Sequence, residues 1–209
     1  MAPAEPGRPL APSLSVIQLI GPGGAGKSTV GALLARRLGW PSRDLDREFE
    51  RRHADIDAFI HVHGYAAYAR ENVATYLELI PHLRSAVLAL SSGFMTYPAT
   101  VHPAYDGVRA AIVRSRTTLV LLPSLDRETC VAETVRRQLG RPICRRDAAA
   151  EEAVIRERFG RYLALPAPKV ETMRPPDEVV AAIHARLAAD APELVPAERW
   201  DAGHREAID

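Results

Sequence analysis

The sequence is poor in cysteine, in net charge of either sign and in long apolar runs. Its two cysteines, Cys130 and Cys144, have no metal-ligand spacing, which favours free thiols in a reducing compartment over a disulfide or a metal site. The net charge is only +1, with acids and bases interspersed, so nothing favours nucleic acid or an anionic membrane as the main partner. No run approaches the ~18 apolar residues of a spanning helix. We therefore expect a soluble cytoplasmic protein.

The length of 209 residues is sufficient for one α/β domain with a full core. Residues 1–13 are rich in Pro and Ala and lack an apolar centre, which predicts a disordered leader and not a signal peptide. The domain is expected over residues 14–189, with a mobile lid at about 141–150. A loosely ordered polar tail is expected over residues 190–209.

Short apolar β-type runs alternate with helical patterns along the chain. Strands are predicted at residues 16–20, 40–45, 85–90, 117–122 and 169–172. Helices are predicted at residues 29–38, 48–60, 66–79, 129–139, 151–162 and 176–188. Such alternation predicts an α/β fold of three layers, in which helices flank a five-stranded parallel sheet. Binding sites in such sheets lie at the carboxyl ends of the strands.

The segment GPGGAGKS, from Gly21 to Ser28, has the spacing of a phosphate-binding P-loop. It follows the first apolar strand and opens a helical run, which is the context that the motif requires. Glycines allow the backbone to point N–H groups at phosphates, Lys27 would reach the β- and γ-phosphates, and Ser28 would bind Mg²⁺. The alternative is a glycine-rich turn without a ligand. The predicted nucleotide-binding residues in the loop are Gly21, Gly23, Gly24, Ala25, Gly26, Lys27, Ser28 and Thr29.

Two carboxylates, Asp44 and Asp46, follow the predicted second strand. Alternate residues of a strand share a side, so both could face the P-loop. One could hold Mg²⁺ and the other could hydrogen-bond a hydroxyl substrate or accept its proton. The alternative is that Asp46, which precedes Arg-Glu-Phe-Glu, is a helix N-cap.

Arginines supply the remaining candidates. Arg141 opens the predicted lid, where an arginine could close over a nucleotide and offset charge in phosphoryl transfer; the alternative is a solvated basic loop. Arg156, Arg158 and Arg161 crowd one predicted helix, where they could capture a carboxylate or phosphate. For two of those three, a solvated face paired with glutamates is the better interpretation. His61 and His63 are read as surface residues and not as metal ligands.

Over residues 16–187 the sequence resembles the shikimate kinases, P-loop kinases of the nucleoside monophosphate kinase type. The matching features are the P-loop, Asp44-Leu45-Asp46, the start of a lid at Arg141-Pro142, Arg158 with Tyr162, and Val170-Glu171-Thr172. The resemblance implies ATP and Mg²⁺ as cofactors, Asp44 in the Mg²⁺ environment and Asp46 on hydroxyls of shikimate. It also implies that Arg158 grips the substrate carboxylate and that Arg141 reaches over ATP.

Three departures from the family pattern lie on the substrate side. The position of a second carboxylate-binding arginine is Ala69, and Arg70 is one residue further on, which turns a side chain by ~100° on a helix. The acid that ends the same motif is Asn72. The family's glycine triplet is Ser91-Ser92-Gly93. The predicted substrate-binding residues are nevertheless Asp46, Arg70, Ser92, Gly93 and Arg158, with Lys27, Asp46 and Arg141 as catalytic residues.

Two hypotheses follow. The first is an ATP-dependent kinase that phosphorylates a hydroxyl of a small anionic substrate, with shikimate as the first candidate and a sugar acid or polyol as the second. The alternative is a sensor that has lost catalysis and acts through a partner protein, since about fifteen residues before the first strand leave no room for a helix-turn-helix. A monomer or weak dimer is expected in either case.

Overall fold

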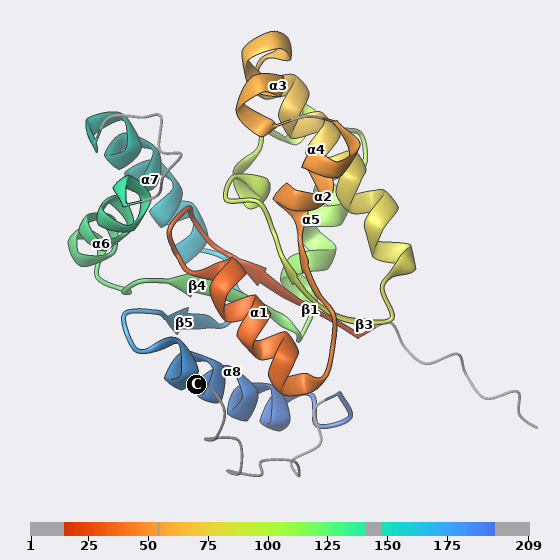
Figure 1. The fold of residues 1–209 in the computed structure, drawn as a ribbon, viewed down its shortest axis with the longest axis vertical. Helices are drawn as coiled ribbons and strands as arrows, with labels where there is room; N and C mark the ends of the chain where they lie inside the picture. Colours follow the sequence, from red (N-terminus) through yellow and green to blue (C-terminus); the bar gives the residue numbers. More distant parts are fainter. Residues whose placement is uncertain (1–14, 54, 141–147, 195–209) are drawn as a thin grey trace, which may run out of the picture.

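The computed structural model describes residues 15–53, 55–140 and 148–194. Arg141, Cys144, most of the predicted lid, the predicted leader and most of the predicted tail lie outside the described residues. The described residues form a five-stranded sheet with eight α-helices around it (Figure 1).

The sheet has the strand order β2-β3-β1-β4-β5, and every neighbouring pair is parallel. Its strands are β1 Ser15–Ile20, β2 Ser42–Asp44, β3 Ser85–Ala89, β4 Thr118–Leu122 and β5 Lys169–Glu171. The chain moves from β1 to β2 and β3 on one side of it, then to β4 and β5 on the other. The winding therefore changes direction at β1, where ligands of open α/β sheets bind. The five-stranded parallel sheet predicted from the sequence is confirmed.

The helices have bounds close to those predicted, apart from two differences described below. They are α1 Lys27–Leu38, α2 Leu45–Arg52, α3 Ile56–His63, α4 Tyr65–Leu79, α5 Tyr105–Arg114, α6 Arg127–Leu139, α7 Ala148–Leu163 and α8 Pro176–Asp190. Short 3₁₀ turns follow α4 and β3, at η1 Ile80–His82, η2 Phe94–Thr96 and η3 Ala99–Val101.

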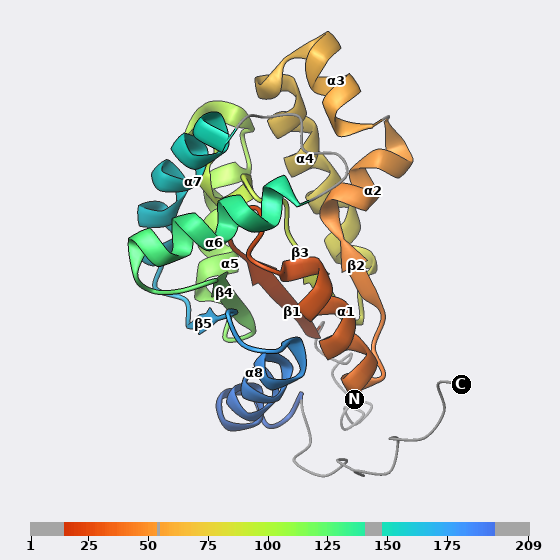
Figure 2. The same ribbon diagram turned by 60° about the vertical axis from the view of Figure 1, so that its left-hand side comes forward.

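Each face of the sheet has its own hydrophobic core. On one face α1 and α8 pack against β1, β3 and β4, through residues such as Leu34 and Ile183 (Figures 1 and 2). On the other face α2, α4, α5 and α7 enclose a larger, aromatic-rich core that contains Phe49, Phe94 and Tyr162. Alternate strand residues serve the two cores, as a sheet buried on both faces requires.

Two helical predictions need correction. The single helix predicted at residues 48–60 is two helices, because Asp55 starts a new one by accepting a hydrogen bond from the Ala58 N–H at 3.0 Å. Helix α5 was not predicted. It follows the irregular η2–η3 segment, and its buried residues Tyr105, Val108 and Ile112 form only a short helical stripe, in a sequence that also contains a glycine at position 107.

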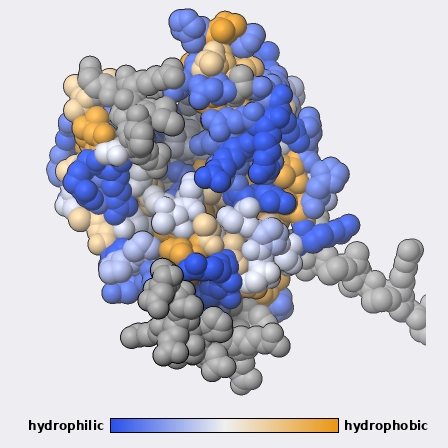
Figure 3. All heavy atoms as spheres, viewed as in Figure 1, coloured by the Kyte–Doolittle hydropathy of each residue, from blue (hydrophilic) through white to orange (hydrophobic). Residues whose placement is uncertain are grey.

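Hydrophilic side chains gather on the surface over α2 (Figure 3), whose two buried residues are Leu45 and Phe49. Among the described helices, none combines the length and the apolar character that crossing a membrane requires.

Candidate functional site

The segments that follow the carboxyl ends of the strands carry the predicted site residues. The P-loop follows β1, Asp44 ends β2, and Ser91-Ser92-Gly93 follows β3. Thr172 follows β5, at the same edge of the sheet. Parallel strands bring these segments together although Gly21 and Thr172 are 151 residues apart in the chain.

The P-loop folds tightly against its surroundings. A Cβ at Gly21, which has a φ of +150°, would lie 2.2 Å from the carbonyl oxygen of Leu121, so only glycine fits there. Lys27 is buried, and its Nζ donates to the carbonyl oxygens of Gly21 and Pro22 at 2.8 Å each. No described side chain caps α1 at its N-terminus. A buried cation and uncapped helical N–H groups fit a phosphate chain in chemistry and in placement.

Arg137 of α6 holds the P-loop in place through hydrogen bonds. Its guanidinium donates to the carbonyl oxygen of Gly24 at 3.2 Å and to that of Thr172 at 2.9 Å. The Thr172 hydroxyl in turn donates to the carbonyl oxygen of Ala25 at 3.0 Å. The P-loop, α6 and the end of β5 are thus fastened together, a support that no sequence motif identified for Arg137.

Asp44 has contacts that fit two roles, one on the nucleotide side of the site and one at the start of α2. Its Oδ2 accepts the Ser28 hydroxyl at 2.6 Å, and its Oδ1 accepts the Asp46 N–H at 3.0 Å. Asp44 is therefore also the N-cap of α2, two residues before Asp46, which the sequence suggested as the cap. A hydroxyl and a carboxylate in contact form an oxygen donor set that Mg²⁺ accepts.

Asp46 is partly buried on the inner side of α2. Tyr68 of α4 donates its hydroxyl to Asp46 Oδ1 at 3.3 Å, and the Ser91 hydroxyl also hydrogen-bonds this carboxylate. Burial raises the pKa of Asp46, the Ser91 hydrogen bond lowers it, and the charge of Asp44 raises it further. Burial also raises the pKa of Tyr68 well above its ordinary value, so that its phenol keeps the proton that it donates.

Arg158 and Tyr162 of α7 both reach the loop after β3. Arg158 donates to the Ser92 hydroxyl at 3.2 Å and to the Tyr65 hydroxyl at 3.1 Å, while Tyr162 donates to the Ser92 carbonyl at 2.9 Å. A Cβ on Gly93 would lie 2.5 Å from Tyr65 Oη and 3.2 Å from an Arg158 nitrogen. The hydroxyls of Tyr65 and Ser92 thus converge on one arginine, and Tyr65 is a residue that the sequence did not single out.

Other predicted residues lie elsewhere. Ala69 is buried, whereas Arg70 is exposed, as expected for neighbours turned apart on α4. Arg156 and Arg161 pair with glutamates of α7, at 2.8 Å to Glu152 and 2.9 Å to Glu157. His61 and His63 are exposed, and no cluster of metal-ligating side chains occurs among residues 15–53, 55–140 and 148–194.

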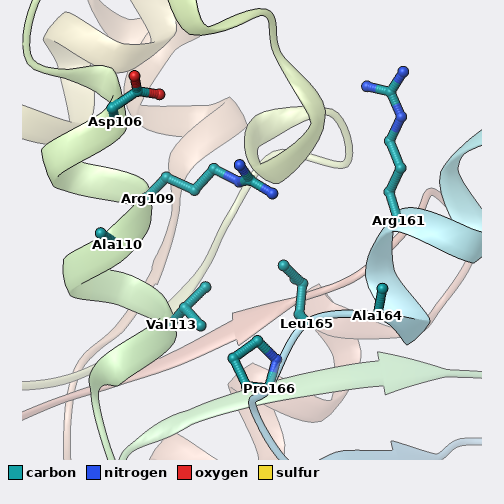
Figure 4. Close-up of a pocket in the computed structure, with 8 residues that line it drawn as sticks. All are labelled: Asp106, Arg109, Ala110, Val113, Arg161, Ala164, Leu165 and Pro166. Carbon is teal, nitrogen blue, oxygen red and sulfur yellow. The ribbon is translucent and has the colours of Figure 1, made fainter.

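A separate groove of about 620 Å³ lies between α5 and the end of α7 (Figure 4). Arg109 and Arg161 extend from its two sides, and Val113, Leu165 and Pro166 lie at its base (Figure 4). Of the candidate arginines only Arg161 lines it, and none of the predicted nucleotide-binding or substrate-binding residues does.

Comparison with known proteins decides the family. A family model described as shikimate kinase matches residues 23–188. The chain belongs to the shikimate kinase family. It is 33% identical over 175 residues to a shikimate kinase of Pseudomonas syringae pv. syringae, which covers 81% of this chain and 94% of that relative. It is 34% identical over 175 residues to one of Pseudomonas entomophila, with the same shares covered.

Solved structures of this family share the fold. A shikimate kinase from Acinetobacter baumannii, in complex with shikimate, superposes with a TM-score of 0.64 at 24% identity and covers 87% of this chain and 96% of its own. One from Aquifex aeolicus gives a TM-score of 0.61 at 24% identity, over 84% and 98%. The P-loop kinase fold expected from the resemblance is confirmed.

Family membership identifies the chain as a kinase that uses ATP, the first of the two hypotheses that the sequence left open. The described residues fit that nucleotide, because the P-loop presents a buried lysine and an uncapped helix at the switch point of the sheet.

Proposed function

We propose that this kinase transfers the γ-phosphate of ATP to a hydroxyl of shikimate. One contiguous row of side chains carries the proposal. Arg158 contacts the hydroxyl of Tyr65, the rings of Tyr65 and Tyr68 lie 5.7 Å apart, and Tyr68 contacts Asp46. An arginine at one end and a carboxylate at the other suit a substrate that carries a carboxylate and hydroxyls on a compact ring.

Arg158 holds the substrate carboxylate in this proposal. Its two hydroxyl neighbours, Ser92 and Tyr65, are themselves donors, and both can turn a proton toward an anion. They supply hydrogen bonds at a site where Ala69 provides no second arginine. Arg70 has no part in the proposal, because it is exposed on the outside of α4.

Asp46 accepts the proton of the attacking hydroxyl. As the hydroxyl oxygen forms its bond to the γ-phosphorus, the bond to the β-phosphate oxygen breaks and ADP leaves. The proton passes to the Asp46 carboxylate. The pKa of this group is raised above the ordinary value of an aspartate, which makes the carboxylate a better proton acceptor. Lys27 balances the charge on the phosphates, and Arg141, which lies outside the described residues, is proposed to do so from the lid.

Mg²⁺ would be held by the Ser28 hydroxyl and by Asp44, directly or through water, and would neutralise charge on the β- and γ-phosphates. With Mg²⁺ bound, Asp44 would lose the hydrogen bond from the Ser28 hydroxyl. Its hydrogen bond from the Asp46 N–H would keep the carboxylate in place.

The test is production of ADP by the purified protein with ATP and MgCl₂, with shikimate or one of a panel of hydroxy acids and polyols that includes gluconate. We expect turnover with shikimate well above the ATP-only background. Lys27→Met should lower kcat by about 10³-fold, since phosphoryl transfer depends on charge stabilisation.

Thr75→Ala is the control, because it removes a buried hydroxyl two turns along α4 from Tyr68, where it donates to the Glu71 carbonyl. Turnover with another compound of the panel but not with shikimate would refute shikimate as the acceptor and would leave the kinase activity intact. Unchanged turnover in Lys27→Met would refute the mechanism.

A further inference from the structure

Asn72 and Ser91, two of the residues that depart from the family pattern, are in contact in the core. Asn72 Nδ2 donates to Ser91 Oγ at 3.0 Å, and Tyr97 donates its hydroxyl to Asn72 Oδ1 at 3.3 Å. Asn72 is 0% and Ser91 2% exposed. Buried polar groups cost free energy unless they are paired, so this set is held together by the need to satisfy every member.

The donors and acceptors of Asn72, Ser91 and Asp46 form a chain of hydrogen bonds. The Asn72 amide is oriented with its oxygen toward the Tyr97 hydroxyl and its NH₂ group toward Ser91. When the Ser91 oxygen accepts from Asn72, its own proton is free for its two other hydrogen-bond partners, the Asp46 carboxylate and the Tyr68 hydroxyl. Tyr68 supplies a second donor to Asp46.

We propose that Asn72 and Ser91 are positioning residues for Asp46: together they hold its carboxylate toward the acceptor hydroxyl. The inference rests on the proposed function, since it gives a purpose to the carboxylate that receives the proton. Ser91 acts on Asp46 directly, and Asn72 acts through Ser91.

The two residues form a matched pair for a chemical reason. A carboxylate at position 72 would accept the Ser91 proton and turn it away from Asp46. It would also bring a second negative charge into a buried site that already holds one. A glycine at position 91 would leave the Asn72 NH₂ group without its partner. Asn72 is therefore suited to a serine at position 91.

The experiment is a double-mutant cycle with Ser91→Ala, Asn72→Ala and the combined variant. Each single change should lower kcat by about tenfold and leave KM for ATP unchanged. The combined variant should lose little more than either single variant, because both act through one hydrogen bond to Asp46. Thr75→Ala, a buried hydroxyl one turn along α4 that donates to the Glu71 carbonyl at 2.8 Å, is the matched control and should keep kcat.

Crystal structures of the wild type and of Ser91→Ala give a second readout that does not depend on turnover. We expect the Asp46 carboxylate to rotate away from its wild-type orientation in the variant. Losses of kcat that multiply in the combined variant, an equal loss in Thr75→Ala, or an unmoved Asp46 would each overturn the positioning role. Absence of shikimate-dependent turnover in the wild type would instead refute the proposed function, and the two crystal structures would still decide the positioning role.

Discussion

At the scale of single residues, the site combines a fixed nucleotide side with an altered acceptor side. Gly21 has no space for a side chain, and Lys27 is buried within the loop. On the acceptor side, hydroxyl and amide groups stand where the family pattern has charge or glycine. Asn72 pairs with Ser91, and Ser92 pairs with Arg158, so these replacements do not add isolated polar groups.

Gly93→Ala tests how closely the acceptor pocket is packed. The φ of Gly93 is −97°, which any residue can adopt, so the only obstacle is space. The added Cβ would lie 2.5 Å from Tyr65 Oη and 3.0 Å from a ring carbon of Tyr97. We expect KM for the acceptor to rise by about tenfold, with KM for ATP unchanged, in steady-state kinetics.

Gly160→Ala is the control for that variant, because it lies on the helix that carries Arg158 and its Cβ would meet nothing within 4 Å. It should leave both KM values unchanged and stabilise α7 by about 1 kcal/mol. An unchanged acceptor KM in Gly93→Ala would show that the acceptor does not bind beside Tyr65 and Arg158.

At the scale of elements, helices α6 and α7 each connect the surface with the site. Helix α7 holds Ser92 through Arg158 and Tyr162, while Arg161 pairs with Glu157 and donates to the Thr96 carbonyl. Helix α6 reaches the P-loop through Arg137, which Glu133 holds at 2.6 Å from the preceding turn. The orientation of the loop therefore depends on an ion-paired helix outside the site.

Glu133→Gln tests how far the Glu133–Arg137 pair supports the P-loop, through the pH dependence of the unfolding free energy. Hydrogen bonds from Arg136 lower the pKa of Glu133 to about 2, against a smaller opposing effect of burial, and Arg137 adds to the lowering. Because the pKa of Glu133 is lower in the folded than in the unfolded protein, the ionised carboxylate stabilises the fold. This contribution is fully present above the unfolded-state pKa near 4.5 and is lost as the pH falls toward 2. We expect the variant to lose about 1 kcal/mol of unfolding free energy at pH 7, measured by urea denaturation.

The difference between wild type and Glu133→Gln should shrink at pH 3. Glu157→Gln, which breaks a more exposed pair with Arg161, should change the unfolding free energy much less at either pH. A difference at pH 3 as large as that at pH 7 would contradict the assigned pKa.

At the scale of the whole molecule, the parallel sheet turns distant segments into neighbours at one edge. Two cores fix that sheet from both faces, so binding at its edge is linked to unfolding of the entire domain. A nucleotide analogue at about a hundred times its Kd should raise the unfolding free energy by about 2.7 kcal/mol. The share of this gain that needs Mg²⁺ reports on the proposed metal ligands.

Asp44→Asn should reduce the extra thermal stabilisation that MgCl₂ gives over EDTA in the presence of a non-hydrolysable ATP analogue. Asp44 also caps α2, so the variant starts from a lower Tm, and only the gains on ligand addition are compared. Asp55→Asn changes the same type of cap on α3, whose Asp55 contacts Ala58, and should keep the full Mg²⁺-dependent gain. An equal gain in all three proteins would exclude Asp44 as a Mg²⁺ ligand.

The sequence predicted the elements whose signals are local. The P-loop spacing, the strands and most of the helices depend on near neighbours in the chain, and they agree with the structure. The break before Asp55 was missed because the apolar periodicity continues across it, and α5 was missed because its stripe is short. Tyr65 and Arg137 were missed because their partners lie 93 and 113 residues away, at Arg158 and Gly24.

By itself the sequence determined that a phosphate-binding loop follows the first strand and that Ala69, Asn72, Ser91 and Ser92 depart from the family pattern. Only the tertiary structure decided what those departures do. It buried Ala69, joined Asn72 to Ser91 beside Asp46, and set the hydroxyls of Ser92 and Tyr65 on Arg158. The physical reason is that motif spacing is set by local backbone geometry, whereas the pairing of buried polar groups depends on which elements the sheet brings together.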